Sequence, residues 1–133
     1  MKAVLPVFFA LLLLSTACAG KKYHLTASPS VPAASGQVQV STDKNGNETV
    51  KLNAEHLANP ASLTPPRNAY VVWIQMPGGK PENEGQMKVG DNLKASFETV
   101  TPYKNFDIFV TAEPDATVKA PSGPEVLRTT VQS

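Results

Sequence analysis

The sequence of 133 residues contains one cysteine, Cys18, and only two histidines. A single cysteine excludes an internal disulfide, and so few Cys and His residues exclude a structural zinc site. An excess of charge is also missing, because 12 lysines and arginines face 11 aspartates and glutamates. Nucleic-acid binding normally needs a clustered basic surplus, so this balance argues against a nucleic-acid partner. The domain must be held together by its apolar core, and the sequence indicates no cofactor.

A long apolar run is missing as well. The longest candidate extends from Ala3 to Leu14 and contains Pro6, whereas a transmembrane helix needs about 20 apolar residues. A lysine precedes this run and small residues follow it from Ser15 to Gly20. That three-part pattern is typical of a signal for export.

The end of this segment, Leu14-Ser15-Thr16-Ala17-Cys18, resembles the lipobox of bacterial lipoproteins. The resemblance implies that residues 1–17 are a signal peptide and that Cys18 becomes an acylated mature N-terminus. Membrane lipid would then be a partner through Cys18, on the periplasmic face of the outer or inner membrane. Ser15 departs from the usual Leu, Val or Ile. Ala19 stands where an aspartate would resemble an inner-membrane retention signal, which favours the outer membrane.

Two alternatives for the N-terminus stay open. Ala17-Cys18-Ala19 also fits an ordinary A-x-A cleavage site, which would release a soluble secreted protein beginning at Gly20. The apolar run would otherwise remain as an uncleaved anchor stopped by Lys21 and Lys22.

The remaining chain divides by composition. Residues 18–36 are rich in Ser, Ala and Pro without periodicity, which predicts a flexible tether. From Gln37 apolar and polar residues alternate, which predicts β-strands. The whole chain has 12 prolines and eight glycines, and such frequent punctuation favours short strands over long helices. We therefore predict one domain, 37–133.

About seven strands are predicted in this domain. They cover approximately residues 37–42, 49–52, 70–75, 86–89, 93–99, 106–113 and 125–131. Asn45-Gly46 predicts a tight hairpin turn, because both residues tolerate positive φ. Leu57 and Leu63 are expected to close the core from a crossing loop, and Leu93 is expected to face inward. Seven short strands predict an immunoglobulin-like two-sheet sandwich with Greek-key connections and no disulfide.

The stretch Tyr70-Val71-Val72-Trp73-Ile74-Gln75 is apolar on both alternating faces. A strand of this kind is covered on both sides or lies centrally in a sheet. We therefore predict that Trp73, the only tryptophan, belongs to the core. Other strand aromatics would form a ligand platform only if they faced outward, and a core role is favoured. Phe109 stands out because its neighbours Asp107 and Thr111 place it on the more polar face.

Two loops carry superficial motifs. Gly78-Gly79-Lys80 is followed by Pro81 rather than by Ser or Thr and a helix, so a hairpin loop is favoured over a phosphate loop.

Asp43, Asn45 and Asn47 imitate the first ligands of a calcium loop. However, Glu48 and Ala54 stand where that loop needs Gly and Glu. No metal site is predicted.

His24, His56, Glu82 and Glu84 are the remaining candidates for acid–base chemistry. His24 falls in the predicted tether, His56 follows a predicted edge strand, and the glutamates flank an asparagine in a polar loop. No triad spacing links them, and solvated side chains are the favoured interpretation. No catalytic residue is predicted.

The C-terminal half resembles the extracytoplasmic C-terminal domain of anti-sigma-K factors. The resemblance rests on Trp73, on Pro81 with Gly85, on Glu113-Pro114, and on Gly123-Pro124 before Val126-Leu127. It covers approximately residues 69–131 and implies a shared β-sandwich module. The family's glycine-rich run after Glu-Pro is replaced by Asp115-Ala116-Thr117-Val118. No sigma-binding domain accompanies it, so the resemblance does not carry the regulatory activity with it.

Three functions remain in view. The first is a non-enzymatic, lipid-anchored cell-envelope protein whose domain binds another envelope component or contributes structurally. The second is a sensory or regulatory module that works with a membrane signalling protein. The third is a soluble secreted protein with an enzymatic site built from loop residues. The sequence favours the first because it offers no sharper chemistry.

Overall fold

The structure is a computed structural model that describes residues 20–132. Within that range there are eight strands, one short 3-10 helix and no α-helix. The elements are β1 (Lys21–Ala27), β2 (Ser35–Thr42), β3 (Glu48–Glu55), η1 (Pro60–Ser62), β4 (Ala69–Gln75), β5 (Glu82–Met87), β6 (Ala95–Thr101), β7 (Phe106–Glu113) and β8 (Glu125–Val131). The all-β prediction is confirmed.

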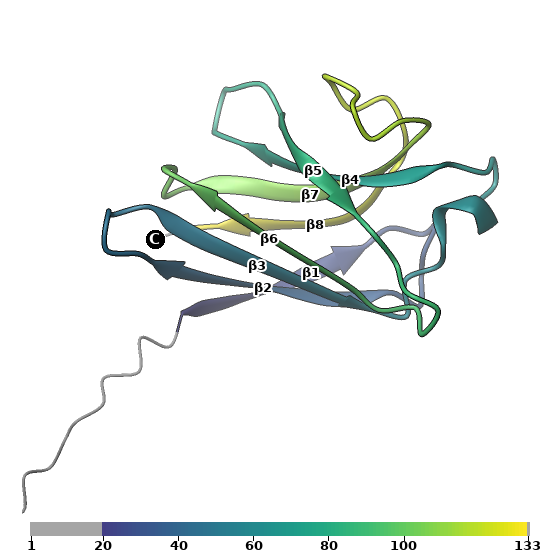
Figure 1. Ribbon diagram of the computed structural model, residues 1–133, viewed down its shortest axis with the longest axis horizontal. Helices are drawn as coiled ribbons and strands as arrows, with labels where there is room; N and C mark the ends of the chain where they lie inside the picture. The colour runs from purple at the N-terminus through teal and green to yellow at the C-terminus, as the bar shows by residue number, and fades with distance from the viewer. Residues whose placement is uncertain (1–19, 133) are drawn as a thin grey trace, which may run out of the picture.

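The strands form one antiparallel sheet in the order β5-β4-β7-β8-β1-β2-β3-β6, which curls until its two edge strands lie near each other (Figure 1). The predicted two-sheet immunoglobulin-like sandwich is therefore not confirmed, and the arrangement is barrel-like instead. The reason is β1. Lys21 to Leu25 pair with β2, and Thr26 and Ala27 pair with β8. This strand joins two groups of strands that would otherwise be separate.

The prediction that 18–36 is a flexible tether is wrong for the residues that the structure describes. Lys21–Ala27 is a strand, and Tyr23 and Leu25 pack in or against the core while Lys22, His24 and Thr26 face outward. The domain therefore includes β1 and does not begin at residue 37. β1 is short and has few apolar residues, and the Ser- and Pro-rich sequence beside it made the whole segment resemble a tether.

Several local predictions are confirmed. Asn45 and Gly46 lie in the connection 43–47 between β2 and β3, so the hairpin is confirmed. Of the two residues only Gly46 has a positive φ, of 80°, which glycine adopts without strain. Leu57 and Leu63 are buried on either side of η1. Leu93 is a correction, because it is 42% exposed and has a φ of 59°.

The boundaries of two strands also differ from prediction. β5 begins four residues before the predicted 86–89, at Glu82, and β6 spans 95–101 rather than 93–99. β5 has few apolar residues, because it is an edge strand whose side chains mostly face solvent.

The core has two parts. The larger cluster fills the inside of the curled sheet and includes Tyr70, Val72 and Ile74 of β4. The smaller cluster lies on the other face of β4 and consists of Val71, Trp73 and Phe109, covered by Ala116 and Val118 of the loop 114–124. β4 is thus buried on both faces, as predicted, and Trp73 is fully buried.

The sheet closes between β5 and β6 without a continuous backbone ladder. A single bridge joins Val89 and Ala95 near the connecting turn. Beyond it, side chains span the gap: Thr99 Oγ1 donates to Glu84 at 2.9 Å, and Tyr103 Oη donates to Glu82 at 2.9 Å. We call this contact the seam.

Candidate functional site

Cys18, the predicted site of lipid attachment, lies outside the described residues. The first described residue, Gly20, is already fitted against β2, since a Cβ atom there would lie 2.4 Å from the carbonyl oxygen of Val40. Only Ala19 separates Cys18 from this packed glycine. The candidate attachment point is therefore adjacent in sequence to the folded sheet.

The chain enters the sheet at one end, which we call the N-terminal end. It comprises Gly20 to Lys22 and the loops 43–47, 76–81 and 102–105. The register places these loops together, because Thr42 and Glu48 lie opposite Thr101 across β2, β3 and β6, and Gln75 lies opposite Asp107. In Figure 1 this end is on the left, where β1 begins and β8 ends.

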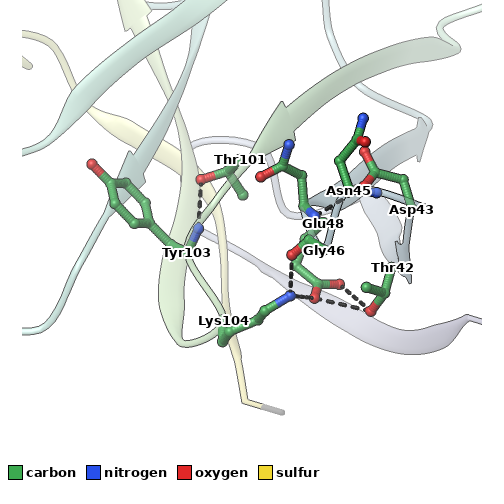
Figure 2. Close-up of polar contacts among 9 residues, drawn as sticks. Thr42, Asp43, Asn45, Gly46, Glu48, Thr101, Tyr103 and Lys104 are labelled. Carbon is green, nitrogen blue, oxygen red and sulfur yellow. Dashed lines mark hydrogen bonds and ion pairs between the residues drawn. The ribbon is translucent and has the colours of Figure 1, made fainter.

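An ion pair between an exposed lysine and a buried glutamate holds two of these loops together (Figure 2). Lys104 Nζ lies 2.5 Å from Glu48 Oε1 and 2.5 Å from the carbonyl oxygen of Gly46. Thr42 Oγ1 also donates to the Glu48 carboxylate, at 3.0 Å. Because Glu48 is buried, this lysine neutralises a charge that would otherwise be costly to bury. The lysine of the 102–105 loop therefore has a structural role.

The residues that imitate a calcium loop, Asp43, Asn45 and Asn47, form hydrogen bonds with one another inside the hairpin. One Asp43 carboxylate oxygen accepts hydrogen bonds from the backbone amides of Asn45 and Asn47, at 2.8 and 2.9 Å. Figure 2 shows Asp43 turned toward this backbone. In the described part of the chain, no three His, Cys, Asp or Glu side chains are grouped as metal ligands.

At the opposite end, Glu113 organises the loop 114–124. Its fully buried carboxylate accepts hydrogen bonds from Thr111 Oγ1 at 2.7 Å, from the Ser122 amide and hydroxyl at 3.0 and 2.5 Å, and from the Gly123 amide at 3.0 Å. Desolvation raises the pKa of Glu113, but the hydrogen bonds from Ser122, Thr111 and Gly123 outweigh it and lower the pKa overall. The carboxylate is therefore held in its charged form.

The same hydrogen-bond chain reaches the tryptophan. Trp73 Nε1 donates to Thr111 Oγ1 at 2.8 Å, and Thr111 in turn donates to Glu113. Asn83 of β5 fixes the other side of the loop by donating to the carbonyl oxygens of Ala116 and Val118, at 2.9 and 2.8 Å. The sequence had marked Glu113-Pro114 and Gly123-Pro124 only through a family resemblance, and the carboxylate–amide contacts now give them a chemical role.

The strand aromatics do not form an open platform. Trp73 and Phe109 stack across β4 and β7 with ring centroids 6.5 Å apart, and Arg128 lies over the Phe109 ring at 4.3 Å. Arg128 is itself paired with Asp107 and Glu125, each at 2.6 Å. Phe109 does face outward as its neighbours suggested, but the loop and Arg128 cover it.

The candidates for acid–base chemistry are not brought together. Glu82 binds Tyr103 near the N-terminal end, whereas His56 directly follows β3 at the opposite end, eight residues beyond Glu48. Eight residues of extended strand span roughly 26 Å. His24 is exposed on β1 and lines a groove of about 300 Å³ with Ser35, Asn53 and Glu55. Among these described residues, no side-chain hydrogen bond joins Ser35, His24 and Glu55, and Glu55 is paired with Lys94 instead. The hydroxyl and the imidazole are therefore not arranged as a nucleophile and its base.

The loop with the glycine pair is a hairpin connection, as predicted. β4 and β5 pair on either side of it, and the Gly79 amide donates to the carbonyl oxygen of Met76 at 2.9 Å.

Among residues 20–132, no helix has the length and hydrophobicity that a bilayer-spanning segment needs. Comparison of the chain with protein-family models, with curated proteins and with solved structures found no match. The resemblances to lipoprotein signals and to the anti-sigma-K module therefore stay predictions.

Proposed function

We propose that this protein is a lipid-anchored protein of the cell envelope, attached through Cys18, whose domain binds or supports another envelope component and has no catalytic role. The observation that carries the proposal is the position of the cysteine. The apolar run and the small residues that follow it lead to Cys18, and Gly20, two residues later, is already packed against β2. Two or more acyl chains on this cysteine would hold the domain at a membrane without a spanning helix.

The structure of the domain supports a binding or structural role. Its two buried carboxylates, Glu48 and Glu113, are both engaged in contacts that fix loops. A carboxylate used in acid–base catalysis needs access to a substrate and an adjusted pKa near the working pH. Neither glutamate offers that access, so binding by an exposed surface is favoured over chemistry.

The proposal is tested by the mass and location of the exported protein. The full chain is expressed in a bacterium that acylates lipoproteins, beside Cys18→Ser and beside Ser15→Leu, which completes the usual signal pattern. We expect the wild type and Ser15→Leu to lack residues 1–17, to carry acyl mass and to sediment with membranes. The Cys18→Ser chain should lose the acyl mass and the membrane attachment.

Two results would contradict the anchor. A mature chain that begins at Gly20 without acyl mass would identify a soluble secreted protein. A chain that keeps residues 1–17 would identify an uncleaved anchor. Co-purification of the acylated protein with a membrane signalling protein would instead favour the sensory or regulatory function.

A further inference from the structure

We propose that the N-terminal end of the sheet lies against the membrane and binds anionic lipid headgroups through four exposed lysines. These are Lys21, Lys22, Lys44 and Lys80. The inference rests on the proposed function, because acylated Cys18 supplies the attachment. It adds which face of the domain meets the lipid and which headgroup chemistry that face recognises.

Chain length fixes the end that faces the bilayer. Consecutive Cα atoms are about 3.8 Å apart, so the Cα of Cys18 lies within about 7.6 Å of the Cα of Gly20. Gly20 has no freedom to swing away, because it is packed against the carbonyl of Val40 at the start of the β1–β2 ladder. A flexible tether over residues 18–36 would have let the domain take any orientation to the membrane. Because β1 is part of the sheet, the anchor is connected to the domain by only a few residues. The acyl chains would therefore enter the membrane beside the loops 43–47, 76–81 and 102–105.

The lysines at this end are available for a partner. Lys21, Lys22, Lys44 and Lys80 are exposed, and the ion pairs found within residues 20–132 do not include them. They belong to the start of β1, to the β2–β3 hairpin and to the β4–β5 loop, so they lie at the same end of the sheet as the point where the chain enters.

The carboxylates at this end are already engaged. Asp43 accepts from two hairpin amides, Glu48 is buried against Lys104, and Glu82 accepts from Tyr103. Five lysines, including Lys104, stand against these three carboxylates and Asp107, which is paired with Arg128, although the whole chain is nearly neutral. Positive charge is thus concentrated at the end that the anchor faces, and anionic headgroups complement it.

The loop 76–81 adds an apolar contact. Met76 is 42% exposed and is followed by Pro77 at the tip of the β4–β5 connection. An exposed methionine beside basic residues suits the boundary between headgroups and acyl chains.

Hydrogen exchange on vesicles tests the inference. The acylated full chain is reconstituted into vesicles of phosphatidylcholine alone, or of phosphatidylcholine and phosphatidylglycerol in equal parts. We expect the amides of loops 43–47 and 76–81 to exchange about tenfold more slowly on the anionic vesicles, because an anionic surface attracts each lysine that lies near it. Loops 88–94 and 114–124 at the opposite end should be unchanged. Raised salt should remove the protection.

A matched pair of variants separates position from net charge. Lys44→Gln with Lys80→Gln should abolish most of the protection. Lys88→Gln with Lys119→Gln removes the same charge from exposed sites at the opposite end and should leave the protection intact.

Equal exchange of the two loops on both kinds of vesicle, or equal effects of the two double variants, would overturn the inference while the acyl mass still supports the anchor. A chain without acyl mass would overturn the inference together with the proposed function.

Discussion

At the scale of single residues, the most heavily engaged side chain is Glu113. It is buried and charged, and every donor around it belongs to the loop 114–124 or to Thr111 beneath that loop. A buried carboxylate without such donors would cost several kcal/mol. The loop therefore stabilises the charge, and the charge fixes the loop over Trp73.

Glu113→Gln should destabilise the domain by about 2–3 kcal/mol, the usual effect of losing hydrogen bonds to a charged group. An amide keeps one acceptor oxygen but turns an NH₂ group toward the donating amides of Ser122 and Gly123. Urea unfolding followed by the fluorescence of Trp73, the only tryptophan, measures this loss. Glu125→Gln, on the exposed rim, is the control and should change stability by less than about 0.5 kcal/mol.

The same carboxylate gives a pH dependence with a defined sign. Its pKa in the folded protein is below the ordinary 4.5, so its stabilising effect is present above pH 4.5 and is lost as the pH falls through the lowered value. Glu113→Gln should flatten that acid-induced loss. Part of the acid-induced loss should remain in this variant, because hydrogen bonds from Thr117 lower the pKa of Asp115 too. An unchanged acid profile in Glu113→Gln would contradict this assignment.

Gly123 is required for space rather than for flexibility. A Cβ atom there would lie 1.7 Å from the carbonyl oxygen of Ala112. This oxygen belongs to the backbone of β7, so it could move aside only if the strand itself shifted. We expect Gly123→Ala to cost more than about 2 kcal/mol, within the range of severe overpacking. Gly79→Ala is the comparison, because its new Cβ would meet its nearest atom at 3.3 Å in an exposed loop. Equal unfolding midpoints for the two variants would show that the loop 114–124 can move aside.

At the scale of elements, strong periodicity predicted most of the sheet. β4 is recognisable by apolar residues on both faces, and the Asn45-Gly46 pair predicts the β2–β3 hairpin from local backbone preference. β1 and β5 were missed or shortened because each is mostly polar, and their pairing is decided by neighbours that are distant in sequence. Leu93 was wrongly predicted to face inward. It lies in the turn before β6, and the alternating pattern does not show where that turn ends and the strand begins.

The candidate site was less predictable than the strands. Cys18 is predicted from a local motif, and that prediction needs no knowledge of the fold. The contacts of Glu113 with Ser122 and Gly123, and of Lys104 with Glu48, join residues whose proximity follows only from the complete topology. No spacing rule in the sequence marks them.

β1 as an integral strand gives a direct test. Leu25 is buried between β2 and β8, whereas its neighbour Thr26 is exposed. Leu25→Ala should destabilise the domain by about 2–4 kcal/mol, the range for truncating a core leucine. Thr26→Ala should cost less than about 1 kcal/mol. Thermal unfolding followed by circular dichroism compares them, and equal melting temperatures would restore a loose tether in place of β1.

At the scale of the whole molecule, closure of the sheet depends on the seam. β5 carries a register shift beside Gly85, whose φ of 132° suits glycine and whose open side is covered by the Phe97 ring, 3.3 Å from where a Cβ would be. Because of this shift Glu84 has no partner residue on β4, and its carboxylate accepts a hydrogen bond from Thr99 of β6. Side chains thus replace the backbone ladder that a fully closed sheet would have, which also protects two edge strands from pairing with other chains.

Tyr103 reports whether the seam is closed. Its hydroxyl donates to Glu82, and this hydrogen bond, followed by the negative charges of Glu82 and Glu84, raises its pKa above the ordinary 10.0. The bond stabilises the folded state below pH 10.0, and this contribution is lost as the pH rises through the raised value. NMR titration of the tyrosine Cζ resonances should therefore show Tyr103 ionising late. Glu82→Gln should return its pKa toward 10.0 and Glu84→Gln should lower it less, because the hydrogen bond to Glu82 is the larger cause. Titration of Tyr103 at its ordinary pKa in the wild-type protein would mean that the sheet stands open between β5 and β6.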